Sequence, residues 1–142
     1  MVSVPSQNID RIISLYRAAM GSNRNLIIGL YSAELFNRLK EFTNSLPQAG
    51  GVNVSIWYPF IQRENLAKEK LFWVMKKHKP HKQSLPEIAK ESKNPVILLR
   101  PPFRKEIGRH FDLSEAVWVY SMWTGYLERS EALQRLKVDG KI

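Results

Sequence analysis

The sequence predicts an α/β fold, namely a three-layer, Rossmann-like open parallel sheet of about four strands flanked by helices. Apolar runs of strand length recur four times along the chain, and stretches with apolar residues at helical spacing separate them. The first run, residues 26–31, lacks apolar–polar alternation, which is typical of a strand buried on both faces. A chain of 142 residues suits one domain, so we expect a single domain over residues 1–142.

The first third of the chain contains a helix, a strand and a second helix. Residues 6–20 place apolar side chains on one helical face, and Ser6 can cap the first turn. Residues 26–31 form the first apolar run, after which Ser32 is expected to cap the second helix. The side chains expected to face inward from that helix are Leu35, Phe36, Leu39 and Phe42.

The rest of the chain repeats the alternation of strands and helices. Strands are expected at residues 52–58, 95–99 and 116–121, and helices at 62–77, 85–92, 104–111 and 130–136. Ser84 can cap the helix that starts at residue 85, since serine oxygen accepts from free backbone N–H groups. Trp118 lies inside an unbroken apolar run, so we expect it to be buried.

Positive charge is concentrated in one region of this chain of net charge +9. Residues 61–110 carry thirteen lysines and arginines against five acidic residues. The predicted nucleic-acid-binding residues are Lys68, Lys70, Lys76, Lys77, Lys79 and Lys82. Lysines at this density neutralise phosphates without reading sequence, so weak, salt-sensitive binding of RNA or single-stranded DNA is expected. An ordinary solvated lysine-rich helix fits the same pattern equally well, and Trp73 is expected in the core more than in a stacking position.

The residues that usually carry catalysis are sparse, so we expect no catalytic residue and no metal site in this chain. Cysteine, a Gly-rich phosphate loop and a Gly-x-Ser-x-Gly motif are all missing from the sequence. His78 and His81 are surrounded by lysines, which favours a solvated basic loop over a metal site. His110 stands alone and is expected to be structural. Glu34 and Glu128 follow strands by a few residues, but nothing in the sequence pairs them.

Several segments, in order and across nearly the whole chain, resemble one family. They are residues 6–11 and 16–19, Arg24, residues 26–33, Pro47 and Gln48, residues 99–101, and residues 119–127. The last of these, Val-Tyr-Ser-Met-Trp-Thr-Gly-Tyr-Leu, is the most specific. Together they resemble the β-CASP-type inserted region of the metallo-β-lactamase-fold exonucleases and RNA-processing hydrolases.

This resemblance implies a fold and an association with nucleic acid, without activity for this chain alone. Members of the family bind two divalent metals, zinc above all, through a His-x-His-x-Asp-His motif upstream of the inserted region. That motif does not occur in this chain, and Gly29 stands where an acidic residue is expected. Two metals are therefore implied only for a longer relative, and no cofactor is expected here.

Two other functions remain open. The chain could be an interaction module that docks on a separate metallo-β-lactamase domain or associates with itself. It could also bind a small molecule at the strand ends, in a crevice near Ser32, Arg100, Ser121 and Trp123. No signal peptide and no apolar run of membrane-spanning length is visible, so we expect a cytoplasmic protein without a membrane partner.

Overall fold

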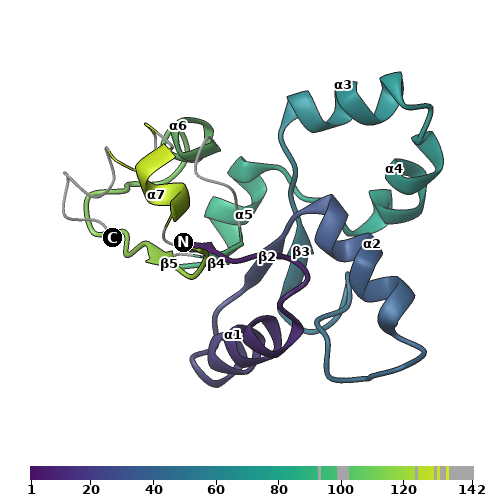
Figure 1. Ribbon diagram of the computed structural model, residues 1–142, viewed down its shortest axis with the longest axis horizontal. Helices are drawn as coiled ribbons and strands as arrows, with labels where there is room; N and C mark the ends of the chain where they lie inside the picture. The colour runs from purple at the N-terminus through teal and green to yellow at the C-terminus, as the bar shows by residue number, and fades with distance from the viewer. Residues whose placement is uncertain (93, 99–102, 124, 130, 132–133, 135–142) are drawn as a thin grey trace.

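The computed structural model describes residues 1–92, 94–98, 103–123, 125–129, 131 and 134, and it has the predicted α/β class (Figure 1). The strands are β1 (Val2–Ser3), β2 (Leu26–Ile28), β3 (Val54–Ile56), β4 (Val96–Ile97) and β5 (Val119–Tyr120). The helices are α1 (Ile9–Gly21), α2 (Leu30–Leu39), α3 (Phe60–Lys68), α4 (Phe72–His78), the 3₁₀ helix η1 (Lys79–His81), α5 (Leu85–Glu91), α6 (Arg104–Ile107) and α7 (Gly125–Arg129).

The strands are parallel and form two small sheets. One sheet has the order β3-β2-β4, with Ile27 of β2 aligned with Ser55 and Ile97. The other pairs β1 with β5, so that Val2 lies opposite Val119. A single parallel bridge between Val2 and Leu98 places the two sheets side by side. Strand β1 was not predicted, because two residues are too few to show a strand pattern.

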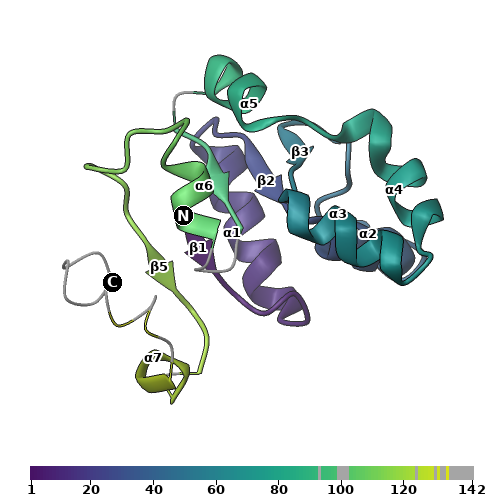
Figure 2. The same cartoon turned by 90° about the horizontal axis from the view of Figure 1, so that it is seen from above.

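Helices pack on both faces of the three-stranded sheet. Leu26 and Ile28 join a core cluster with residues of α1 and α2, whereas Ile27 joins a second cluster with residues of α5 and α6. Adjacent strand residues point to opposite faces, so both faces of β2 are covered. Figure 2 shows α5 on the opposite side of β2 and β3 from α2. This double cover explains why the sequence of β2 is apolar without alternation.

The structure corrects two of the predicted helix caps. Asn8, rather than Ser6, caps α1, because its side chain accepts a hydrogen bond from the Arg11 backbone N–H. Helix α2 starts at Leu30 after an extended Gly29, so the strand that was predicted for residues 26–31 ends at Ile28. Ser32 therefore lies inside the helix, where its hydroxyl meets that of Ser6 at 2.8 Å. An apolar run cannot distinguish a strand from the buried first turn of a helix.

The predicted helix over residues 62–77 is two helices, α3 and α4. Lys70 has a φ of 57°, a left-handed conformation that no helix interior tolerates, so the chain turns there. Phe42 is also misplaced by the prediction: α2 ends at Leu39, and Phe42 is 82% exposed beyond it. Both errors arise because apolar spacing alone does not mark where a helix stops.

Other predictions are confirmed. Ser84 caps α5 in a capping box with Glu87, and Trp118 is 3% exposed, with its Nε1 donating to the Ser3 hydroxyl at 3.1 Å. Strand β5 is shorter than predicted and begins after Trp118. The terminal helix predicted for residues 130–136 falls mostly outside the described residues. Across the part of the chain that the structure describes, no helix has the length and apolarity needed to cross a bilayer.

Candidate nucleic-acid interface

Helices α3 and α4 form a projecting corner beyond the end of β3 (Figure 1). None of the residues of α3 is buried, and α4 is anchored through Val74 and His78, which lie one turn apart. This spacing turns the neighbouring aromatic residues outward. Phe72 is 57% exposed and Trp73 is 47% exposed. The expectation that Trp73 belongs to the core is therefore wrong, because α4 buries only a narrow stripe.

The exposed indole of Trp73 is flanked by two cations. The Arg38 guanidinium carbon lies 5.7 Å from the ring centre, and the Lys77 amine lies 6.0 Å from it. Both distances are within the range of a cation–π interaction. Arg38 comes from α2, so the packing of α2 against α4 creates this arrangement. Sequence reasoning missed Arg38 because it lies 35 positions before the tryptophan.

The six predicted lysines differ in their surroundings. Five of them, Lys68, Lys70, Lys76, Lys77 and Lys79, are exposed on α3, α4 and the segments that follow these helices. Among these, the amine of Lys77 forms an ion pair with Glu34 at 2.9 Å. Lys82 is half-buried, with its amine 5.1 Å from the centre of the Tyr58 ring. Four of the six lysines thus remain available to solvent phosphates.

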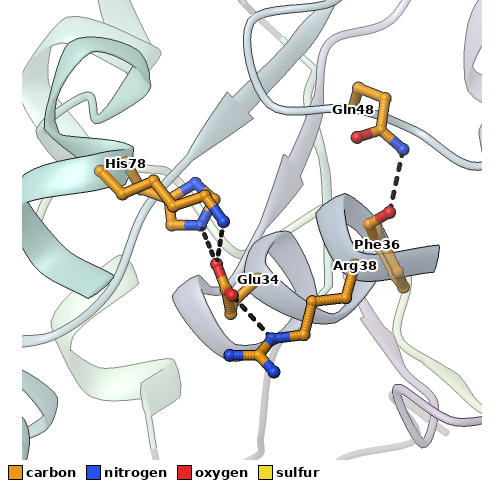
Figure 3. A network of polar contacts seen from close by, with 6 residues as sticks. Glu34, Phe36, Arg38, Gln48 and His78 are labelled. Carbon is orange, nitrogen blue, oxygen red and sulfur yellow. Dashed lines mark hydrogen bonds and ion pairs between the residues drawn. The ribbon is translucent and has the colours of Figure 1, made fainter. Parts of the chain in front are cut away.

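Glu34 connects α2 to α4 through three basic groups (Figure 3). Its Oε1 accepts from Arg38 Nε at 2.8 Å, while its Oε2 accepts from Lys77 Nζ and lies 2.9 Å from His78 Nε2. Desolvation alone would raise the pKa of the Glu34 carboxyl. The hydrogen bonds from Lys77, His78 and Arg38 outweigh it and lower this pKa to about 2. The carboxylate was expected to be unpaired, because its partners on α4 are distant in the sequence.

His78 differs from the expectation of a solvated loop, whereas His81 is exposed as expected. His78 is buried against Glu34, and the ring of His81 packs closely over Gly50. Within the described residues, no three His, Cys, Asp or Glu side chains are arranged to hold a metal ion. The described residues therefore do not provide the ligands for the two metals implied for a longer relative.

The strand-end crevice exists, and of the three predicted residues that the structure describes, only Ser32 lines it. Its volume is about 530 Å³, and Gly29, Ser32, Trp57 and Met122 are among its lining residues. Ser121 lies outside the lining and accepts hydrogen bonds from Arg11.

Trp123 does not line the crevice either. Trp123 is 61% exposed and lies under the guanidinium of Arg129, 5.8 Å from its ring centre. Arg100 falls outside the described residues.

Comparison with known proteins returns no match: no family model, no curated protein and no solved structure is similar to this chain. The functional proposal therefore rests on the geometry of the corner formed by α3 and α4 and of the strand-end crevice.

Proposed function

We propose that this chain is a nucleic-acid-associated domain that binds RNA or single-stranded DNA weakly and does not hydrolyse it alone. The observation that carries this proposal is the exposure of Phe72 and Trp73 among lysines on α4. Cations that track a phosphate backbone, next to aromatic rings that stack on bases, are the usual elements of a sequence-tolerant single-strand surface. Lysine alone would suit any polyanion, whereas the exposed rings favour a strand with unpaired bases.

The resemblance to the β-CASP-type region leads to the same proposal from the sequence. In a complete enzyme of that class, a three-layer, Rossmann-like domain of this kind would help clamp RNA or DNA over the metal site. The parallel strands and the helices on both faces of the three-stranded sheet are compatible with that architecture. The corner formed by α3 and α4 is then the part that contacts the strand.

Charge reversal at the corner tests the proposal. Lys68, Lys76 and Lys79 are exposed, so changing all three to Glu should leave the melting temperature nearly unchanged. Wild type should bind a fluorescently labelled single-stranded oligonucleotide with a Kd of roughly 1–100 μM. Anisotropy should show the affinity falling steeply between about 50 and 200 mM salt, because each neutralised phosphate releases counterions. Lys77 is left intact, since a glutamate there would face Glu34.

The matched control reverses three exposed lysines elsewhere. Lys40, Lys90 and Lys105 lie at the end of α2, on α5 and on α6, so the triple change to Glu alters the net charge equally. Binding should be lost in the corner variant and largely kept in the control. Equal loss in both variants would show that only net charge matters. Absence of binding by wild type at low salt would end the proposal for this chain.

A small-molecule site is favoured by one specific observation, the strand-end crevice of about 530 Å³. This volume falls within the roughly 300–1,000 Å³ of typical ligand pockets. The carboxyl ends of parallel strands are also where α/β folds bind ligands. Thermal stabilisation by mononucleotides, without affinity for oligonucleotides, would select this function over the first.

An interaction module is favoured by exposed apolar side chains on β5 and just before it. Val117 and Val119 are exposed, and within the described residues β5 pairs with β1 alone. Such a strand edge can pair with a metallo-β-lactamase domain or with a second copy of the chain. Light scattering that detects a dimer, and its loss on changing Val119 to Lys, would support this function.

A further inference from the structure

A second, smaller pocket shares Trp57 with the crevice. It opens where β3 ends, between the starts of α3 and α5 and the end of α6. Its volume is about 250 Å³. Its aromatic and basic lining residues are Trp57, Tyr58, Phe60, Arg63, Lys82 and His110. Sequence reasoning singled out only Lys82 as a binding residue among these. His110 was expected to be structural, but it is exposed at the rim.

Aromatic rings and cations are paired in this pocket. The ring of Phe60 is 61% exposed, and the Arg63 guanidinium carbon lies 5.5 Å from its centre. The Lys82 amine lies over the ring of Tyr58. Unstacked bases bind to proteins by stacking on aromatic rings and on arginine planes, so Phe60 and Arg63 together offer a stacking surface.

The lining of the pocket contains two cations and one carboxylate. Arg63 and Lys82 face one carboxylate of the lining, that of Glu106. The carboxylate of Glu87, close to Lys82, is already engaged, because it accepts hydrogen bonds from the backbone N–H and hydroxyl of Ser84. These bonds do not remove the negative charge of Glu87, which acts on Lys82, so the two cations are balanced by two carboxylates and Lys82 offers only a local contact to an anionic group.

The size of the pocket limits its ligand. At about 250 Å³ it is smaller than the roughly 300–1,000 Å³ of pockets for drug-sized molecules, so it suits one ring system with a flanking group. Phe60 begins α3 and Lys68 ends it, a helix of nine residues and about 13 Å in length. A strand held at Phe60 therefore reaches the lysines of the corner within a few nucleotides.

We propose that this pocket holds one nucleotide of a single-stranded nucleic acid, with its base stacked on Phe60 and Arg63 and a phosphate near Lys82. The inference rests on the proposed function and deepens it, since it assigns the base contact to a site separate from Trp73. The lysines of the corner then hold the backbone without regard to base, whereas the Phe60 pocket requires a base.

Oligonucleotides with and without bases distinguish base binding in the Phe60 pocket from backbone binding by the lysines of the corner. A labelled 12-nucleotide oligothymidylate is compared by anisotropy with an abasic strand of the same length and backbone charge. Phe60→Ala should weaken binding of the oligothymidylate by about five- to hundredfold, the range expected for losing one stacked base. Binding of the abasic strand should not change. Phe60→Tyr keeps the ring and should restore binding of the oligothymidylate.

Phe42→Ala is the matched control, because this exposed phenylalanine lies beyond α2 and outside the pocket. It should leave binding of both strands unchanged. Arg63→Gln gives a second test at another exposed residue; it removes a charge as well as a stacking plane, so it should weaken binding of the base-bearing strand more than binding of the abasic strand. The melting temperature of each variant shows whether the fold is retained.

The outcomes are distinguishable. If Phe60→Ala and Arg63→Gln weaken both strands equally, or neither, the pocket is not a base site. The proposed function still stands in that case, provided that reversal of Lys68, Lys76 and Lys79 abolishes binding. If neither strand binds to wild type at low salt, the pocket and the proposed function are both refuted.

Discussion

Replacing Glu34 with Gln should loosen α4 from α2. The carboxylate accepts from Arg38 and Lys77 and contacts the buried ring of His78, so its loss leaves these groups facing a neutral amide. A pKa of about 2, against an ordinary 4.5, sets an upper limit of about 3 kcal/mol on the stabilisation at neutral pH. Arg38 and Lys77 partly reach solvent, which screens their charges, so we expect a loss of about 1–2 kcal/mol.

The pH dependence provides the sharper measurement. The pKa of Glu34 is lowered by folding, so its contribution is complete above pH 4.5 and is lost as the pH falls toward 2. Glutamine does not titrate. Urea unfolding followed by tryptophan fluorescence should therefore show a difference between wild type and Glu34→Gln that is constant near pH 6–7 and shrinks below about pH 4.5.

The exposed Glu41, just beyond α2, is the matched control, and Glu41→Gln should change little at any pH. Equal stability of wild type and Glu34→Gln at pH 7 would refute the reasoning. A stability difference that stays the same from pH 7 to pH 3 would refute it as well, because the charge would then not be its cause.

Three further predictions concern stability and can be checked by urea or thermal unfolding. Trp118→Ala should lower the free energy of unfolding by about 3–5 kcal/mol because a buried indole is removed. Trp123→Ala, at an exposed ring, should lower it by less than about 1 kcal/mol, and equal losses would contradict the burial of Trp118. Gly50→Ala should destabilise the fold by more than about 1 kcal/mol, because Gly50 has a φ of 76° and a Cβ there would lie 2.3 Å from His81 Nδ1. Gly21→Ala is the control, since a Cβ at Gly21 meets open space and should not destabilise the fold. Ser84→Ala should cost about 1 kcal/mol by removing the cap of α5, and no loss would mean that the capping box is unimportant.

The resemblance and the fold are supported to different extents. The α/β class and the parallel strands agree with the prediction, since buried strands need continuous apolar runs that can be read locally. The match of residues 119–127 to a β-CASP-type motif stays a prediction. It depends on the identity of residues around β5, which the strand geometry does not test.

The sequence by itself determined the positions of the strand centres, the cap of α5, the burial of Trp118 and the basic character of α3 and α4. Each of these follows from neighbouring residues: an apolar run, a serine three positions before a glutamate, or a cluster of lysines. Local propensities and patterns act over a few residues, so one sequence is enough to detect them.

Only the tertiary structure decided which residues meet. The pairing of β1 with β5 joins opposite ends of the chain, and the contact of Glu34 with His78 joins two helices far apart in sequence. The exposure of Trp73 and the pocket at Phe60 likewise depend on how α3 and α4 pack beside α2 and α5. Burial and charge pairing are properties of packed surfaces, so residue spacing along the chain cannot specify them.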